Sequence, residues 1–210
     1  MPKQIGVEIV AEGRWLNFAK AKWVNALGET REWEMIQRKM PRGGLNVVEV
    51  VPILRLRGQP PQIVLVSQYR VPVDHETLEL PAGLVDGEQT AEQTARRELW
   101  EETGYTCGAM TLSPMLTLNP AIAETTSKMV TVEIDGDHPD NEDPHPHNAV
   151  AEGERTTVHL LPLDQHLPQR LQEMGASGEL LIEARLYAFA QGIALAHTLG
   201  IAAPVAPHSL

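Results

Sequence analysis

The sequence of 210 residues is poor in cysteine and in aromatic residues, with one Cys and four Trp, three Tyr and two Phe. A single cysteine, Cys107, cannot form an internal disulfide, so nothing indicates an oxidising compartment. We interpret Cys107 as a small packing residue, because no histidine lies near it in the sequence. No stretch is long and apolar enough to span a bilayer. The first residues also lack the basic-then-apolar order of a signal peptide. We therefore expect a cytoplasmic protein, with the nucleus or another reducing compartment left open.

Positive charge is also scarce. Lys and Arg total 17 against 28 Asp and Glu, which gives a formal net charge of −11. Such an excess of negative charge repels phosphate backbones and anionic lipids, so we expect no nucleic-acid partner and no membrane partner. The hydrophobic content of 42% over this length is enough for one domain with a buried core and an appended arm.

The order of apolar and turn-forming residues predicts mainly strands, followed by helices near the C-terminus. Residues 5–40 alternate polar and apolar side chains around turn signals, which predicts a small antiparallel hairpin arm. The segment Pro41–Gly44 then interrupts this pattern. Further strands are predicted at 46–56, 62–69, 77–80, 110–118, 128–134 and 155–161, and helices at 163–174 and 178–199.

One predicted helix, from Thr90 to Gly104, has clear signals at both ends. Thr90 and Gln93 have the spacing of a capping box, in which a hydroxyl and an amide side chain satisfy the first free backbone groups. Gly104 supplies the residue that most easily adopts the left-handed conformation at a helix end. The sequence therefore defines this helix better than any other element.

Three glutamates crowd the last turns of this helix. At about 100° per residue, Glu98, Glu101 and Glu102 lie within one arc that borders the apolar stripe. Partly buried carboxylates are unfavourable unless they are paired or bind a metal ion. All-oxygen ligands favour Mg²⁺ or Mn²⁺ over Zn²⁺. The alternative is an acidic surface helix in which Arg96 and Arg97 neutralise the carboxylates.

The segment from Gly83 to Tyr105 resembles the signature of the Nudix hydrolases, G-x5-E-x7-R-E-U-x-E-E-x-G-U, where U is aliphatic. Two positions depart from it, because Gln89 replaces the first glutamate and Tyr105 replaces the last aliphatic residue. Using Glu88 instead would require a one-residue shift, and Thr90 as helix cap favours the ungapped register. In the family the first glutamate mainly supports the loop through the motif arginine, so we expect Gln89 to affect the scaffold more than the chemistry. The matching positions are Gly83, Arg97, Glu98, Leu99, Glu101, Glu102 and Gly104.

Other matches resemble the ADP-ribose pyrophosphatase branch of this family. The segment Glu79–Gly83 resembles its lead-in, and Pro120 occupies the place of a marker proline. The segments Glu12–Trp15 and Thr30–Trp33 resemble an arm that eukaryotic members exchange between two subunits. The resemblance implies an α+β fold, an α/β/α sandwich with a mixed sheet, and a homodimer formed through the arm. It divides the chain into an arm (1–42), a Nudix hydrolase domain (43–201) and a disordered tail (202–210).

The implied activity is the Mg²⁺-dependent hydrolysis of the pyrophosphate bond of ADP-ribose and related nucleotide sugars, giving AMP and ribose 5-phosphate. One alternative is another nucleotide sugar such as a UDP-hexose, and a second is a non-catalytic nucleotide-binding domain, which Gln89 favours. By resemblance the metal ligands are Glu98, Glu102, the backbone carbonyl of Ala82 and, in an assisting role, Glu101. Mn²⁺ is the second candidate ion.

The general base in this branch is a glutamate in a loop before a late strand. Glu154 matches it best and Glu152 second, although a solvated acidic loop is a serious alternative. Three histidines nearby, His138, His145 and His147, have no ligand-like spacing, so we interpret them as exposed loop residues.

Substrate recognition calls for a flat aromatic surface for adenine and for cations that pair with phosphate. Trp15 and Trp33 are candidates for stacking on the base, with packing in the core or the arm as the alternative for each. Arg38 and Arg70 are candidates for forked pairing with phosphate oxygens. The resemblance implies that Glu79 orients the terminal ribose.

Overall fold

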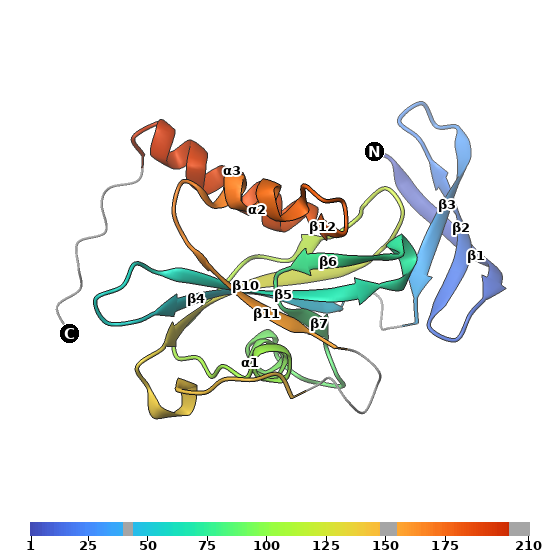
Figure 1. Ribbon diagram of the computed structural model, residues 1–210. Helices are drawn as coiled ribbons and strands as arrows, with labels where there is room; N and C mark the ends of the chain where they lie inside the picture. Colours follow the sequence, from blue (N-terminus) through green and yellow to red (C-terminus); the bar gives the residue numbers. More distant parts are fainter. Residues whose placement is uncertain (40–43, 148–154, 202–210) are drawn as a thin grey trace.

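The computed structural model describes residues 1–39, 44–147 and 155–201 (Figure 1). In these residues a three-stranded sheet precedes a nine-stranded mixed sheet and three α-helices. In chain order the elements are β1 (Lys3–Glu12), β2 (Leu16–Val24), β3 (Thr30–Arg38), β4 (Val47–Arg55), β5 (Gln62–Arg70), the 3-10 turn η1 (Val71–Val73), β6 (His75–Glu79), β7 (Ala82–Leu84), α1 (Ala91–Thr103), β8 (Met110–Leu112), β9 (Leu116–Thr117), β10 (Thr126–Asp135), the 3-10 turn η2 (Pro139–Asn141), β11 (Thr157–Pro162), α2 (Leu167–Gly175), β12 (Leu180–Ile182) and α3 (Ala184–Thr198).

The large sheet is the middle layer of a sandwich, with α1 on one face and α2 and α3 on the other (Figure 1). Its main strand order is β12-β6-β5-β4-β10-β8, and β11, β7 and β9 pair with β5, β4 and β10. The pairs β4–β10 and β6–β12 are parallel, while the other pairs are antiparallel. The predicted α+β sandwich with a mixed sheet is therefore confirmed.

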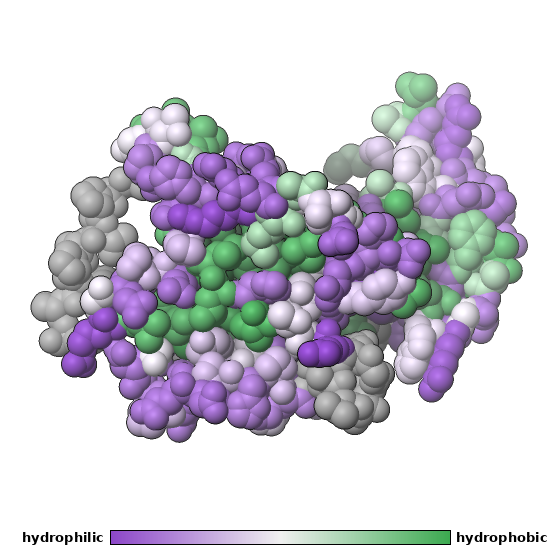
Figure 2. Space-filling model, in the orientation of Figure 1, coloured by the Kyte–Doolittle hydropathy of each residue, from purple (hydrophilic) through white to green (hydrophobic). Residues whose placement is uncertain are grey.

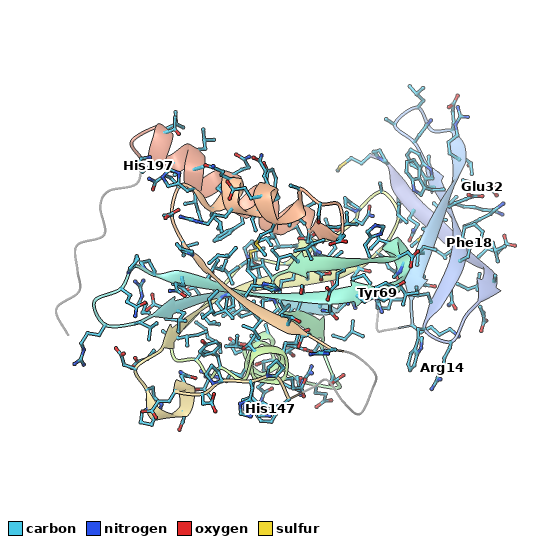
Figure 3. The ribbon with its side chains drawn as sticks, in the orientation of Figure 1. Arg14, Phe18, Glu32, Tyr69, His147 and His197 are labelled. Atoms are coloured by element: carbon cyan, nitrogen blue, oxygen red, sulfur yellow. The ribbon has the colours of Figure 1, made fainter. Side chains whose placement is uncertain are left out.

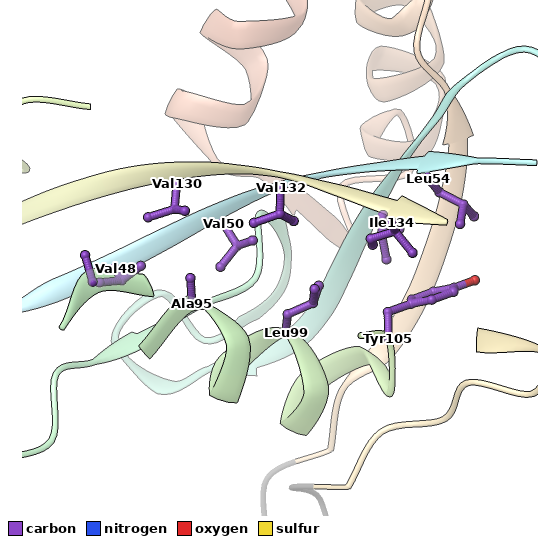
Figure 4. Packing of buried hydrophobic residues seen from close by; sticks show 11 residues of the cluster. Val48, Val50, Leu54, Ala95, Leu99, Tyr105, Val130, Val132 and Ile134 are labelled. Carbon is purple, nitrogen blue, oxygen red and sulfur yellow. The ribbon is translucent and has the colours of Figure 1, made fainter. Parts of the chain in front are cut away.

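Strand β4 separates two hydrophobic cores because successive side chains point to opposite faces of a sheet. Val48 and Val50 pack with Leu99 of α1 in the first core (Figure 4). Val51 packs with Leu186 of α3 in the second core. A strand buried on both faces is apolar almost throughout, which explains the continuous Val and Ile run in the sequence.

The N-terminal arm consists of three strands, so the predicted hairpin was one strand short. β1 pairs with β2 and β2 with β3, all antiparallel, around a small core of Ala19, Ala21 and Met35. The arm stands at one end of the domain (Figure 1) and joins it through the backbone N–H of Ile36, which donates to the Ile122 carbonyl at 2.8 Å. Hydrophobic side chains reach the surface of the arm (Figure 2). Exposed examples are Ile5, Ile9 and Val10.

The C-terminal helices and one strand differ from the prediction. The helix predicted at 178–199 begins only at Ala184, because Leu180–Ile182 forms β12 and pairs with β6. Glu183 then caps α3 by accepting hydrogen bonds from the first backbone amides. The helix predicted at 163–174 begins at Leu167. The strand predicted at 110–118 is divided into β8 and β9.

The other predicted core strands agree with the structure to within two residues at each end. None of the helices in the described residues is long and apolar enough to cross a membrane.

Candidate active site

Helix α1 is fixed at both ends as its sequence predicts. The Thr90 side chain accepts from the backbone N–H of Gln93 at 3.3 Å, and the Gln93 side chain accepts from the backbone N–H of Thr90 at 2.8 Å. Gly104 ends the helix in the left-handed conformation, with φ of 79°. Ala95 and Leu99 hold the helix against the sheet because both are fully buried in the first core. The predicted caps of this helix are confirmed.

Two of the three glutamates on α1 are buried. Glu98 is 7% exposed and Glu102 is 5% exposed, whereas Glu101 is half-buried. Burial raises the pKa of Glu98 to about 7 and the pKa of Glu102 to about 8. Repulsion by the Glu98 carboxylate is the second cause of the raised pKa of Glu102. The site therefore disfavours two ionised carboxylates on their own, and a bound cation would remove that cost.

Arg97 is the cation that contacts the cluster. Its Nη1 lies 2.8 Å from Glu98 Oε1 and 2.9 Å from Glu101 Oε2. Arg96 turns elsewhere and donates to the backbone carbonyls of Cys107 and Gly108. The interpretation of α1 as a solvated surface helix neutralised by both arginines is therefore wrong.

Gln89 contacts the motif arginine despite its departure from the signature. Its Oε1 accepts from Arg97 Nε at 3.3 Å and from the Thr94 hydroxyl at 3.2 Å. Arg97 also donates to the Leu84 carbonyl at 2.8 Å, so it links the loop before α1 to the helix. A neutral amide oxygen thus makes the loop contact expected of the missing glutamate, which supports the ungapped register.

Ala82 and Gly83, at the start of β7, lie directly against the carboxylates. The backbone N–H of Ala82 donates to Glu102 Oε2 at 3.1 Å. A Cβ on Gly83 would overlap the Glu98 carboxylate, so a larger residue at this position would require that carboxylate to move. β7 pairs with β4, and the Val50 N–H donates to the Pro81 carbonyl at 2.8 Å. These bonds hold Ala82 and Gly83 close to the carboxylates of α1.

These residues fit a hard divalent cation. The donors are the carboxylate oxygens of Glu98, Glu101 and Glu102, and Mg²⁺ and Mn²⁺ prefer oxygen ligands. In the described part of the chain no three His, Cys, Asp or Glu side chains are already arranged as a metal site. Glu98 and Glu101 both face Arg97, so these carboxylates would have to turn from the guanidinium to bind a cation.

Arg70 and Glu79 form a second charged group, on β5 and β6. Arg70 Nε and Nη2 donate to the two carboxylate oxygens of Glu79 at 2.8 and 2.7 Å. The Thr77 hydroxyl also donates to Glu79. Burial opposes ionisation, but the hydrogen bonds from Arg70 and Thr77 prevail and lower the pKa of Glu79. The structure therefore brings these two predicted substrate residues together as an ion pair.

The arm residues lie apart from the α1 cluster. Trp15 is 66% exposed, and its ring centroid lies 4.7 Å from the guanidinium carbon of Arg14. Trp33 is 51% exposed, donates from Nε1 to the Ala121 carbonyl at 2.9 Å, and lines a cavity of about 380 Å³ between the arm and residues 120–124. Arg38 is half-buried, and its Nε has no hydrogen-bond partner among the described residues. Neither tryptophan forms a hydrogen bond or ion pair with α1 in the described chain.

The two candidates for the general base, Glu152 and Glu154, lie outside the described residues. Shortly after them in the sequence, Thr156 is described. It is 7% exposed, and its hydroxyl donates to the Glu102 carbonyl at 3.2 Å.

One buried charge was not predicted from the sequence. Glu49 of β4 is 4% exposed and lies 2.6 Å from Nη1 of Arg185 at the start of α3. Ser127 donates to the same carboxylate at 3.4 Å. A signal for it exists, because Glu49 is the only charged residue within the apolar run of residues 47–54.

Two other residues have clear surroundings. His147 is an exposed loop residue, as predicted, and its ring stacks on Trp100 with 4.0 Å between centroids and 12° between planes. Figure 3 shows His147 beside α1. Cys107 packs against the first core, and burial raises the pKa of its thiol, which agrees with a packing role.

Comparison with known proteins adds to this geometry. Residues 46–180 match the family model described as the NUDIX domain. The ADP-sugar pyrophosphatase of Mus musculus is 35% identical over 191 residues, covering 90% of this chain and 85% of the relative. The ADP-ribose pyrophosphatase of Saccharomyces cerevisiae is 30% identical over 193 residues, covering 90% and 81%. The crystal structure of an ADP compounds hydrolase aligns with a TM-score of 0.64 over 95% of both chains, at 21% identity, and so shares the fold.

Proposed function

The chain belongs to the Nudix family, and from this premise we propose that it hydrolyses the pyrophosphate bond of ADP-ribose and related ADP-sugars. The products from ADP-ribose would be AMP and ribose 5-phosphate. The observation that carries the proposal is the pair of buried carboxylates, Glu98 and Glu102, held against Ala82 and Gly83 of β7. The names of the relatives from mouse and yeast support the choice of an ADP-sugar as substrate.

In this proposal Glu98, Glu102 and the carbonyl of Ala82 hold the divalent cation, and Glu101 assists. Bound Mg²⁺, or Mn²⁺ in its place, neutralises charge on the pyrophosphate and makes a bound water more acidic. Glu154, or Glu152 as second candidate, takes the proton from the attacking water. These roles are carried over from the family signature.

The substrate-binding roles fall on residues outside α1. Arg70, fixed by Glu79, presents a guanidinium suited to a phosphate oxygen, and Glu79 also serves to orient the terminal ribose. Trp15 and Trp33 stack on adenine, and Arg38 pairs with phosphate. Because the arm stands apart from α1 within one chain, we propose that two subunits form a homodimer in which Trp33 serves the partner's site. The exposed apolar residues of the arm support an interface there.

The test is to incubate the protein with ADP-ribose and Mg²⁺, with and without EDTA, and to separate the products chromatographically. The expected result is AMP and ribose 5-phosphate in equal amounts, with none formed in EDTA. UDP-glucose in a parallel reaction tests the alternative substrate class, and Glu98→Gln is the inactive control. A protein that binds ADP-ribose but releases no AMP would instead be a nucleotide-binding domain.

A further inference from the structure

The C-terminal end of α1 carries two proposed metal ligands, Glu101 and Glu102. Their backbone carbonyls accept hydrogen bonds from residues outside the helix. The last four carbonyls of a helix have no partner within it. The backbone N–H of His147 donates to the Glu101 carbonyl at 2.7 Å, and the Thr156 hydroxyl donates to the Glu102 carbonyl at 3.2 Å. The carbonyls of both ligand residues are therefore satisfied by contacts that α1 cannot supply itself.

An aromatic contact holds the first of these donors in place. The His147 ring stacks on Trp100, which is 45% exposed and belongs to neither hydrophobic core. The His145 ring lies 5.2 Å from the His147 ring at a tilt of 45°. A Cβ on Gly104 would overlap the backbone of His145, so the loop touches the end of the helix directly. Trp100 therefore serves as a platform for the loop and is not explained by core packing.

The end of α1 needs such support because of the charges on it. Like charges four residues apart on a helix repel each other, as Glu98 and Glu102 do when ionised. Helix ends also fray more readily than helix centres. A displacement of about 1 Å in a catalytic group can cost on the order of 100-fold in rate. A contact that fixes the last turn of α1 therefore also fixes the positions of the proposed metal ligands on that turn.

We propose that Trp100 and His147 are positioning residues that hold the last turn of α1, and with it Glu101 and Glu102, in the geometry that binds the divalent cation. The identity of the ligands rests on the proposed function, but cation binding is measured without substrate. Removal of either ring frees the loop, weakens the hydrogen bond from the His147 amide to the Glu101 carbonyl, and lets the turn open.

The experiment measures Mn²⁺ affinity by electron paramagnetic resonance and amide hydrogen exchange of residues 101–104 in the metal-free protein. Trp100→Leu and His147→Ala are expected to weaken Mn²⁺ binding about tenfold, which is the order of effect seen when groups that orient metal ligands are removed, and to speed exchange. Trp100→Phe and His147→Phe keep a flat ring and should stay within about twofold of the parent protein. Arg96→Met is the matched control, because it removes contacts of α1 with the residues 107–108 and leaves the stack intact.

Unchanged Mn²⁺ affinity in Trp100→Leu and His147→Ala would overturn the proposal. Equal weakening in Arg96→Met, or in the two phenylalanine variants, would also overturn it, because the effect would then be general loss of stability. Circular dichroism confirms that each variant is folded before binding is measured. If the parent protein fails to hydrolyse ADP-ribose but its Mn²⁺ affinity follows the expected order, the proposed function fails and the positioning role stands.

Discussion

Helix α1 and the N-terminal arm both carry residues assigned to the site, but they are stabilised in different ways. α1 has its own caps, a buried stripe and carboxylates that meet within one stretch of 13 residues. The arm has a core of three buried side chains and exposes Ile5, Ile9, Trp15 and Trp33. A three-stranded sheet is stable on its own only when its strands share a hydrophobic face, and the core of this sheet is small. The difference indicates that the carboxylate cluster of α1 is encoded locally, whereas the stability of the arm depends on what the arm packs against.

The largest effect is expected from the α1 carboxylates. Glu98→Gln or Glu102→Gln keeps the shape of the side chain and removes its charge, so turnover should fall about 1,000-fold, of order 4 kcal/mol. Steady-state kinetics with Mg²⁺ as sole cation provides the measurement. Glu92→Gln, a change at a half-buried position in the first turn of the same helix, should leave turnover within about twofold. Near-normal turnover in both the Glu98 and Glu102 variants would show that these carboxylates of α1 take no part in the reaction.

A second large effect is expected at the loop that faces α1. Gly83→Ala places a methyl group where the Glu98 carboxylate lies, so either the loop or the ligand must move. We expect turnover to fall about 100-fold, since a shift of about 1 Å at a reacting group has an effect of that order. Gly87→Ala, in the loop between β7 and α1, meets no neighbouring atom but has φ of 56°, so it controls for backbone strain alone. Equal losses in the two variants would argue against the close contact with Glu98.

The arm should affect substrate affinity more than turnover. Trp33→Ala is expected to raise KM about tenfold while kcat changes less than twofold, because stacking on adenine contributes to binding of the ground state and the transition state alike. Trp33→Phe keeps a ring and should recover part of the affinity.

If the arm joins two subunits, its removal should also abolish the dimer. Light scattering of the full-length protein and of a variant lacking residues 1–40 checks the subunit count beside the kinetics. A full-length monomer with normal KM, or a shortened form with unchanged KM, would show that the arm neither joins subunits nor reads the base.

The smallest effect is expected at Gln89. Because its Oε1 already accepts from Arg97 and Thr94, Gln89→Glu should change kcat/KM by no more than about tenfold, or 1.4 kcal/mol. Gln89→Ala, which removes both hydrogen bonds, should lower the melting temperature more than Gln89→Glu does. A parent protein that is inert and gains hydrolysis on Gln89→Glu would favour the non-catalytic, nucleotide-binding alternative.

Helix α1 follows almost completely from local features of the sequence. Caps, the apolar stripe and the glutamates are all local features with a fixed period, so the spacing of Thr90, Gly104 and the glutamates is enough to place them on the helix. The apolar runs likewise determined the central strands, because a strand covered on both faces must be apolar throughout.

Other features of the fold and the site depend on contacts between distant parts of the chain. The residues of β12 have a helical pattern in the sequence, yet they pair with β6, because backbone hydrogen bonds to a distant sheet edge outweigh a weak local preference. The ion pair of Glu49 with Arg185 and the stack of His147 on Trp100 join residues at least 47 positions apart. The spacing of residues along the sequence does not predict such contacts, because they form only after the layers have packed and brought these side chains within reach.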